Sequence, residues 1–408
     1  MIDIGTIFQN LAPYLPYIGL GFVVAVLATP MVARLALKVW AVDLPAHLRG
    51  RQDTTSDRRI HENIVPKFTG MILFLPIALV LLSGGQLSSL PWGILAGAFV
   101  MVLAGLIDDK FDLPAKYQLL LQLLAAVLVV VSGVTITFVQ VAGVSMDFAS
   151  WSHVFQIGNL VYNMILPADI ITVLWIVAVI NFVGWVDGVD GVHGSLTLVA
   201  AFTILLIMMR SGAAMPALLI LAALFIGGNL GFLPYNLSPA KMFYSGATMF
   251  TGFVLAVLAL MSTSKLAITI IVLGLPVFDA LLVVFLRFRE HPDLLRSPLK
   301  ILSISDKNHL HFRLLDLGYS KKMVVLLELI IMGMFCLIAF YFSGFENDSL
   351  ALLAGVVAIG VIFEIIAIGR RRAAKIAERK RAEEAAKPKI EVQAAVVPGT
   401  KPGEKFTY

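Results

Sequence analysis

The sequence has few charged residues and only one cysteine. Among its 408 residues, 14% are Asp, Glu, Lys or Arg and 59% are hydrophobic, and the mean hydropathy is +0.91. In soluble domains about a quarter of the residues are charged, so this composition excludes an ordinary soluble protein and indicates a membrane protein. The single cysteine, Cys336, lies in an apolar stretch. One cysteine excludes both a disulfide framework and a cysteine metal site.

Several segments also lack positive charge. Residues 134–168, 84–91 and 344–348 contain no Lys or Arg, whereas the loops that alternate with them are basic. Because Lys and Arg favour the cytoplasmic side of a membrane, we predict that the basic loops are cytoplasmic. The N-terminus is then outside and the C-terminus inside. Residues 1–17 lack the basic start and cleavage site of a secretory signal peptide.

Apolar segments of spanning length recur along the chain. We predict an all-α polytopic membrane protein with about eleven transmembrane helices. They lie near residues 17–39, 68–83, 92–107, 117–133, 169–186, 194–210, 214–233, 248–263, 266–286, 323–343 and 349–369. These form a transmembrane domain of residues 1–369, followed by a basic, partly disordered cytoplasmic tail at 370–408. The segment 134–168 begins with the alternating "VTITFVQVAG", which predicts a small extracytoplasmic β-hairpin.

Four polar clusters fall on the predicted cytoplasmic side. They are "GLIDDKFDLPAK" at 105–116, "NFVGWVDGVDGVHG" at 181–194, "GFLPYNLSPAKMFYSGATMF" at 231–250 and "SPLKILSISDKNHLHFRLLDLG" at 297–318. The predicted outer segments carry no comparable cluster. We therefore predict a site built from cytoplasmic loops, which suits one reactant from the cytosol and another from the lipid.

Two pairs of aspartates lie in these clusters. Asp108 and Asp109 follow a long apolar run, where a carboxylate is unfavourable unless it is solvated, paired or bound to a cation. Solvated boundary residues are the alternative interpretation. Asp187 and Asp190 are three residues apart, which places them on one side of a helical turn. Neighbouring glycines let the backbone approach a ligand, although a plain turn has the same pattern.

Other polar residues have simpler interpretations. Asp112 precedes a Leu-Pro pair, so we predict that it caps the next helix. Glu328 and Glu364 lie inside apolar segments, and we expect both to extend to the membrane interface. Asp279 lies deeper, about two turns inside its predicted span, where an ionisable residue indicates a functional role.

The four clusters resemble, in order, the motifs of the polyprenyl-phosphate N-acetylhexosamine-1-phosphate transferases, a membrane family of glycosyltransferase 4 type. "GLIDDKFDLPAKYQLLLQ" resembles the aspartate-pair motif, "DGVDG" the second aspartate motif and "GFLPYNLSPAKMF" the third. "LPVFDALLVVFLRFR" and "SDKNHLHFRLLDLG" resemble the histidine loop. The likeness covers residues 17–340. It is closer to the branch that uses UDP-N-acetylglucosamine than to the phospho-N-acetylmuramoyl-pentapeptide transferases, whose loop has three consecutive histidines.

The resemblance implies a reaction. A sugar-1-phosphate would pass from a UDP-sugar to polyprenyl phosphate, with release of UMP, at the start of a lipid-linked cell-envelope glycan. The protein would be a multi-pass protein of the inner (plasma) membrane with a cytoplasmic active site, and its cofactor would be Mg²⁺, or Mn²⁺ in its place. We expect no nucleic-acid partner, and a homodimer stays open.

The resemblance also assigns roles to residues of this sequence. The expected catalytic residues are Asp108, Asp109, His309 and His311, and the expected substrate-binding residues are Asp187, Asp190, Asn236, Lys241 and Asp306. Asp109 and Asp187 are in addition the expected metal ligands.

Three positions depart from the family's pattern. Members usually carry Gly-Asp-x-Gly-Ser after the Pro-Ala-x-x-Phe element, and its Asp binds magnesium. Here "YSGATMFTG" follows instead, and Ser245 is nearest to the missing Asp. Gly184 replaces a usual Asn, and Phe312 replaces the last His of the histidine loop. A catalytically impaired relative that acts as a binding or scaffold protein is therefore one alternative. A transporter is another, and it predicts charges spread through the membrane rather than gathered on one side.

Overall fold

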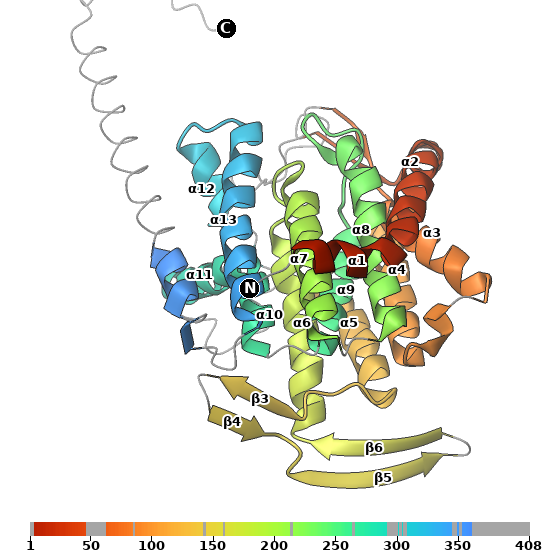
Figure 1. Cartoon of the computed structure of the whole chain (residues 1–408). Helices are drawn as coiled ribbons and strands as arrows, with labels where there is room; N and C mark the ends of the chain where they lie inside the picture. The colour runs from red at the N-terminus through yellow and green to blue at the C-terminus, as the bar shows by residue number, and fades with distance from the viewer. Residues whose placement is uncertain are drawn as a thin grey trace, which may run out of the picture. The chain divides into compact units, whose positions relative to one another are not determined.

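The computed structural model describes residues 4–45, 63–84, 86–141, 144–157, 160–212, 215–262, 266–291, 301, 304, 308–344, 349–350 and 353–360. Its helices follow the apolar segments of the sequence. In chain order they are α1 (Ile4–Leu11), α2 (Leu15–Lys38), α3 (Thr69–Leu82), α4 (Trp92–Phe111), α5 (Ala115–Val131), α6 (Ala168–Trp185), α7 (Val192–Ser211), α8 (Pro216–Asn236), α9 (Ala247–Met261), α10 (Leu266–Val272), α11 (Gly274–Glu290), α12 (Leu310–Asp316) and α13 (Lys321–Phe342) (Figure 1).

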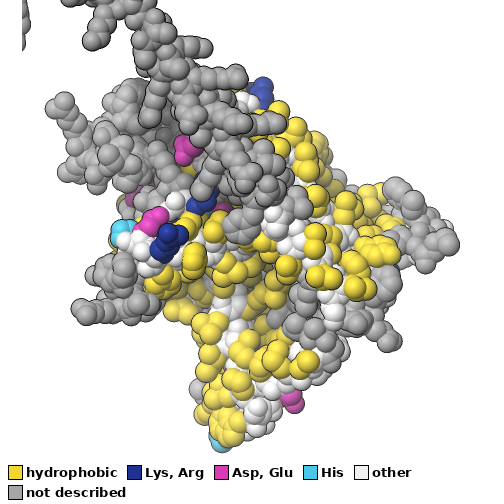
Figure 2. Space-filling model, turned by 90° about the vertical axis from the view of Figure 1, so that its left-hand side faces the viewer, with side chains coloured by type: hydrophobic (Ala, Val, Ile, Leu, Met, Phe, Trp, Pro, Cys, Tyr) yellow, Lys and Arg dark blue, Asp and Glu magenta, His cyan; other side chains and the backbone are white. Residues whose placement is uncertain are grey.

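Five helical segments of the described residues are long and apolar enough to cross a bilayer. They are Gln9–Lys38, Ala168–Trp185, Val192–Ser211, Pro216–Asn236 and Lys321–Phe342, and α3, α5 and α9 are shorter apolar helices. Figure 2 shows hydrophobic side chains over most of the described surface of one face, as a surface in contact with lipid requires. The chain is thus a helical membrane protein. The count of eleven spans stays a prediction, because 349–369 and the tail from 370 lie mostly or wholly outside the described residues.

The predicted ninth span, 266–286, is not one helix. It consists of α10 and α11, which are separated at Leu273. Pro276 explains the break, because its ring cannot pack against the carbonyl four residues earlier and it has no N–H to donate to it. That carbonyl belongs to Val272, and it accepts a hydrogen bond from the Cys336 Sγ at 3.8 Å instead. The prediction of a continuous helix missed the effect of this proline.

Residues 138–166 form two antiparallel strand pairs. β3 (Phe138–Val141) pairs with β4 (Val144–Asp147), and β5 (Trp151–Ile157) pairs with β6 (Leu160–Leu166). Figure 1 shows both pairs at the end of the bundle where α6 begins. A third pair, β1 (Val42–Asp43) with β2 (Val65–Pro66), connects the chain between α2 and α3. The side of the membrane on which β3–β6 lie stays a prediction.

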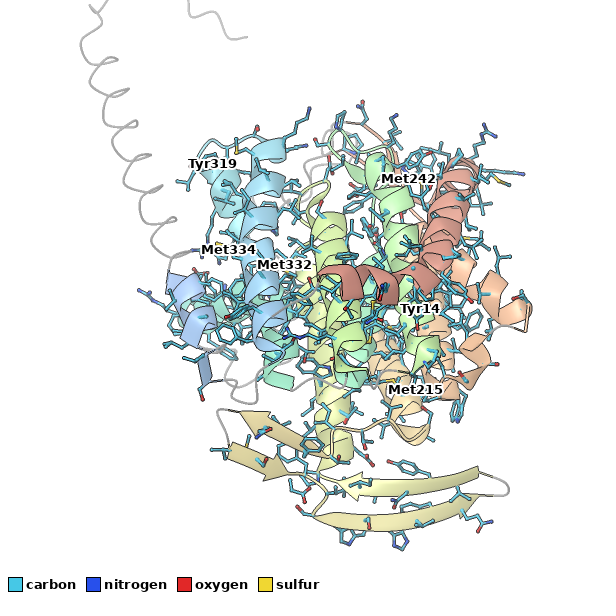
Figure 3. The ribbon with its side chains drawn as sticks, viewed as in Figure 1. Tyr14, Met215, Met242, Tyr319, Met332 and Met334 are labelled. Atoms are coloured by element: carbon cyan, nitrogen blue, oxygen red, sulfur yellow. The ribbon has the colours of Figure 1, made fainter. Side chains whose placement is uncertain are left out.

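The loops that carry the polar clusters lie at the end away from β3–β6. Figure 3 labels Met242 and Tyr319 at that end, and Met215, which precedes α8, lies nearer the strands. α8 therefore runs from the strand end toward the polar end. This arrangement gathers the ends of α4, α6 and α8 and the start of α9 in one region.

Helix α8 is buried along most of its length and packs closely against α2. A Cβ atom added at Gly227 of α8 would lie 2.1 Å from the backbone oxygen of Ile18 in α2. Such a separation is impossible, so the two backbones approach closely only because residue 227 is glycine. Small residues commonly allow helices to pack in this way in membranes.

Replacement of Gly227 by alanine is therefore expected to destabilise the fold. The added methyl group must push α2 and α8 apart, which costs about 1–3 kcal/mol in overpacked interiors. Gly19 of α2 is a matched control, because a Cβ atom there would meet nothing within 4 Å. Thermal unfolding in detergent should show a lower Tm for Gly227→Ala and an equal or higher Tm for Gly19→Ala, since alanine favours helices. Equal Tm values for the two variants would contradict the observed packing.

Candidate functional site

Asp109 is buried near the C-terminal end of α4, beyond the predicted span 92–107, with 3% of its surface exposed. Its Oδ2 accepts a hydrogen bond from the Phe68 N–H at 2.9 Å, and its Oδ1 accepts one from the Gly246 N–H at 2.8 Å. Burial raises the pKa of the Asp109 carboxyl to about 6, although both N–H groups favour its charged form. Asp109 thus joins the start of α3 to the start of α9.

Asp108 faces another neighbour, because adjacent residues of a helix point about 100° apart. Its Oδ1 accepts hydrogen bonds from the Leu113 N–H, just before α5, and from the Gln118 Nε2, in the first turn of α5, both at 2.9 Å. The prediction that Asp112 caps α5 is therefore wrong. Asp112 ends α4 in the left-handed conformation, with φ of 48°, and the N-cap of α5 is Pro114, without a side-chain cap.

Asp187 approaches the same loop as Asp109. Its Oδ2 accepts a hydrogen bond from the Ser245 N–H at 3.2 Å, while Asp109 accepts one from the next N–H group, that of Gly246. The Ser245 side chain also hydrogen bonds to Asp109. The structure therefore brings together the two carboxylates that the sequence predicts as metal ligands, and Ser245 contacts both of them.

This pair of carboxylates fits a magnesium site that substrate completes. Mg²⁺ in proteins is commonly held by one or two carboxylates together with substrate phosphates. Asp109 and Asp187 meet at adjacent N–H groups, and each carboxylate oxygen can accept more than the one hydrogen bond described. Among the described residues, no group of three or more His, Cys, Asp or Glu side chains could hold a metal ion. Binding by the free protein is thus expected to be weak.

His309 is completely buried and pairs with Asp279. Its Nδ1 lies 2.7 Å from the Asp279 Oδ2, and the Asp279 Oδ1 accepts the Leu310 N–H at 2.7 Å. The Nε2 atom of His309 makes no hydrogen bond within the described part of the chain. Asp279 thus fixes the ring and leaves Nε2 for a ligand, and the functional role of this buried carboxylate stays a prediction.

His311 lies beside His309, with the two rings parallel and their centroids 5.5 Å apart. A Cβ atom added at Gly188 would lie 1.9 Å from the His311 Nε2, so this ring edge faces the backbone between Asp187 and Asp190. The Nδ1 atom of His311 lies 3.9 Å from the Glu328 Oε1. The expectation that Glu328 extends to the interface is wrong, since it is 1% exposed. Glu364 lies outside the described residues.

Asn236 holds two of the loops together. Its Oδ1 accepts the Gly191 N–H at 3.0 Å, and its Nδ2 donates to the Met242 carbonyl at 3.1 Å. Asn236 thereby positions the segment that carries Asp190, which is buried, whereas Lys241 is exposed on the loop. A cavity of about 240 Å³ lies there, lined by Asn63, Val65, Asp190, Ser238, Pro239, Ala240 and Lys321. Asp306 lies outside the described residues.

Two cations of the site were not found by the sequence reasoning. Lys67 is nearly buried, its Nζ is 3.5 Å from the Asp112 Oδ1, and its charge favours the ionised forms of Asp108 and Asp109. Arg287 is buried at the end of α11, where its Nη1 donates to the Ile301 carbonyl at 2.8 Å. In the sequence, Lys67 stands alone between apolar residues, and this pattern could have marked it as a buried cation. Arg287 is one of many basic residues near its loop, so nothing in the sequence singles it out.

Ser245 offers a test of the site, because aspartate there would add a third carboxylate. Aspartate tolerates the left-handed conformation that Ser245 adopts, with φ of 46°. A further negative charge beside Asp109 and Asp187 attracts a cation more strongly. We expect Ser245→Asp to strengthen Mg²⁺ binding by about tenfold, or about 1.4 kcal/mol.

The same substitution should strengthen Mg²⁺ binding without substrate. The measurement is the Mg²⁺-dependent rise in Tm of the substrate-free protein, which should occur at lower Mg²⁺ in Ser245→Asp than in wild type. Ser245→Asn is the matched control, since it has the same shape without the charge. An unchanged Mg²⁺ response of a folded Ser245→Asp variant would show that residue 245 does not face the cation.

Known proteins match most of the chain, including this region. Residues 91–263 match Glycosyl transferase family 4. A Bacillus subtilis (strain 168) protein named "Probable undecaprenyl-phosphate N-acetylglucosaminyl 1-phosphate transferase" is 31% identical over 321 residues, which are 76% of this chain and 80% of that protein. The "Decaprenyl-phosphate N-acetylglucosaminephosphotransferase" of Mycolicibacterium smegmatis is 27% identical over 86% of this chain and 87% of its own length. The protein of the same name from Mycobacterium leprae is also 27% identical, over 86% of this chain and 89% of its own length.

Proposed function

Because the chain belongs to glycosyl transferase family 4, we propose that it transfers N-acetylglucosamine-1-phosphate from UDP-N-acetylglucosamine to a polyprenyl phosphate and releases UMP. The choice of acceptor lipid and of transferred group follows the names of the relatives. The UDP-sugar donor is our inference, which rests on the resemblance of the histidine loop. The site would face the cytoplasm at the plasma membrane, in agreement with the distribution of Lys and Arg.

One observation carries the proposal. Asp109 and Asp187 meet at the Ser245 and Gly246 N–H groups, and His311 lies against Gly188, next to Asp187. The four sequence clusters thus contribute to one region at one end of the helices. A site for two anionic reactants at a membrane surface needs such a concentration of carboxylates, histidines and cations.

The proposed reaction exchanges one phosphorus–oxygen bond for another. An oxygen of the lipid phosphate attacks the phosphorus that carries the sugar. The bond from this phosphorus to the oxygen of UMP breaks, UMP leaves with the electron pair, and a diphosphate then joins lipid and sugar. The Nε2 atom of His311 can donate to a phosphate oxygen in the tautomer that carries its proton there, the Asp279 hydrogen bond fixes the His309 ring beside it, and exposed Lys241 adds positive charge. The cavity beside Asp190 is our candidate for the nucleoside.

Asp109 and Asp187 would hold the magnesium ion. When bound, Mg²⁺ supplies charge neutralisation for the diphosphate and for the departing phosphate. Burial raises the pKa of both Asp108 and Asp109, and the positive charge of Lys67 partly opposes this shift.

A release assay tests the proposal. Purified protein in lipid nanodiscs is mixed with UDP-N-acetylglucosamine, polyprenyl phosphate and Mg²⁺, and UMP is measured. We expect UMP that depends on all three additions and that other UDP-sugars yield more slowly. Absence of UMP from a protein that still binds UDP-N-acetylglucosamine would favour the binding or scaffold alternative. Release from UDP-N-acetylmuramoyl-pentapeptide instead would move the protein to the other branch.

A further inference from the structure

Tyr244 is completely buried in the segment between α8 and α9. It directly precedes the two residues on which the candidate site converges. The Ser245 N–H donates to the Asp187 Oδ2 at 3.2 Å. The Gly246 N–H donates to the Asp109 Oδ1 at 2.8 Å. A shift of the Tyr244 backbone would therefore move both N–H groups and disturb the two carboxylates together.

The Tyr244 hydroxyl group has its partner inside a membrane-spanning helix. It donates a hydrogen bond to the Asn229 Oδ1 of α8 at 2.8 Å. Asn229 is completely buried, and its Nδ2 donates to the Phe225 carbonyl of its own helix at 2.8 Å. A buried amide is unfavourable unless it is hydrogen bonded, and leucine would pack in α8 without that cost. Contact with Tyr244 is therefore the reason that we infer for an asparagine at this position.

Neighbouring helices also hold the Tyr244 ring. The rings of His193 from α7 and Phe232 from α8 have their centroids 4.7 and 4.9 Å from that of Tyr244. His193 is itself fixed, because its Nε2 lies 2.7 Å from the Thr251 Oγ1 of α9. A Cβ atom added at Gly194 would lie 2.8 Å from the Tyr244 hydroxyl oxygen, so glycine leaves room for this group. Three helices thus fix one tyrosine.

We propose that Asn229 and Tyr244 are positioning residues, whose hydrogen bond holds the Ser245–Gly246 segment where Asp109 and Asp187 can both reach a magnesium ion. The inference rests on the proposed function, to which the metal and the reaction belong. Neither residue contacts the substrate, and both act through the backbone that follows Tyr244. Because functional groups must be held to within about 0.5 Å, loss of this hydrogen bond should weaken Mg²⁺ binding and lower kcat.

Tyr244→Phe removes the hydroxyl group and keeps the ring. The Asn229 Oδ1 is then buried without a donor, which lowers stability. We expect Tm to fall and kcat for UMP release to fall about tenfold at a temperature where the variant is folded. This loss is smaller than the effect of a displacement by a full ångström. Tyr244→Phe by itself does not separate a positioning role from a merely structural one, because stability changes as well.

A double variant separates the two roles. Tyr244→Phe combined with Asn229→Leu replaces both partners by apolar groups of similar shape, a change that can be nearly neutral or stabilising. We expect the Tm of the double variant to return to that of wild type or to exceed it. Its kcat should stay about tenfold below wild type, because no hydrogen bond then holds the segment. A merely structural role predicts instead that kcat recovers together with Tm.

Mg²⁺ binding without substrate gives a second measurement. The Mg²⁺-dependent rise in Tm of the substrate-free protein should require about tenfold more Mg²⁺ in the double variant than in wild type. Tyr235→Phe is the matched control, because it also removes a tyrosine hydroxyl group from α8 or its loop. The Tyr235 hydroxyl donates to the Val26 carbonyl of α2 at 3.5 Å, away from the Ser245–Gly246 segment. Tyr235→Phe should leave kcat and the Mg²⁺ response unchanged.

The outcomes distinguish the inference from the proposed function. An unchanged kcat in Tyr244→Phe, or a double variant that regains kcat together with Tm, would overturn the inference and leave the proposed function intact. If the wild type releases no UMP, the proposed function fails, and the Mg²⁺ response of the substrate-free variants still decides the inference. A wild type that neither releases UMP nor responds to Mg²⁺ would overturn both.

Discussion

Gly188→Ala is expected to reduce UMP release at least about 100-fold, because displacement of catalytic groups by about an ångström has effects of this size. The new methyl group would lie 1.9 Å from the His311 Nε2 and 2.5 Å from its Cδ2. The His311 ring cannot retreat easily, because it is buried between His309 and Phe312, with ring centroids 5.5 and 4.4 Å away. Gly188 does not adopt a positive φ, so the requirement for glycine is one of space alone.

Gly184 is the matched control for this substitution. It lies in the same segment, and a Cβ atom there would have its nearest neighbour, the Thr248 Oγ1, at an ordinary 3.6 Å. Gly184→Ala should therefore keep most of the activity. The two variants are compared by kcat and by Tm in the same detergent. Full activity in a folded Gly188→Ala protein would mean that His311 does not lie against the aspartate loop during turnover.

The sequence predicted most helices because apolar segments of the right length leave the backbone few alternatives in a membrane. The prediction from the sequence failed where a single residue determines the point at which a helix ends. Pro276 divides the ninth predicted span, and it was visible in the sequence. The capping of α5 could not be predicted in the same way. Asp112 is close to α5 in the sequence, but it ends α4 instead, and α5 begins after Pro114 without a side-chain cap, while Asp108 accepts the Leu113 N–H that precedes the helix.

The sequence indicated which residues to assign to the candidate site better than it indicated how they are arranged. The resemblance to the family's motifs selected Asp109 and Asp187, and in the structure both accept hydrogen bonds from the Ser245–Gly246 segment. Asn236 was predicted to contact substrate, yet the structure uses both ends of its side chain to hold loops. Glu328 was missed because its partner, His311, belongs to another element. Only tertiary structure shows that this glutamate faces inward rather than toward the interface.

Asp109→Asn is expected to reduce turnover at least about 100-fold, which corresponds to about 2.7 kcal/mol of transition-state stabilisation. Both Asp109 oxygens accept backbone N–H groups, from Phe68 and Gly246. Asparagine has one oxygen, so its NH₂ group must face one of these donors, and a buried donor is then left without an acceptor. The substitution also removes a charge that the metal would need.

Asp112→Asn is the control for Asp109→Asn. Asp112 has a side chain that is 68% exposed, and asparagine also tolerates its left-handed conformation. The activity of Asp112→Asn should stay within about twofold of wild type, because the Asp112 end of its ion pair with Lys67 is exposed to solvent, which weakens the pair. Asp108→Asn is expected to reduce turnover by about as much as Asp109→Asn, and loosening of α5 would contribute to its loss.

Kinetics and stability together distinguish the two roles of Asp109. If the carboxylate only joins α3 to α9, Asp109→Asn would lower Tm while the molecules that remain folded keep their kcat. If it also serves the reaction, kcat falls at temperatures where the variant is fully folded, and added Mg²⁺ does not restore it. We expect the second result. Near-normal kcat in folded Asp109→Asn protein would remove Asp109 from the metal site and leave it a purely structural carboxylate.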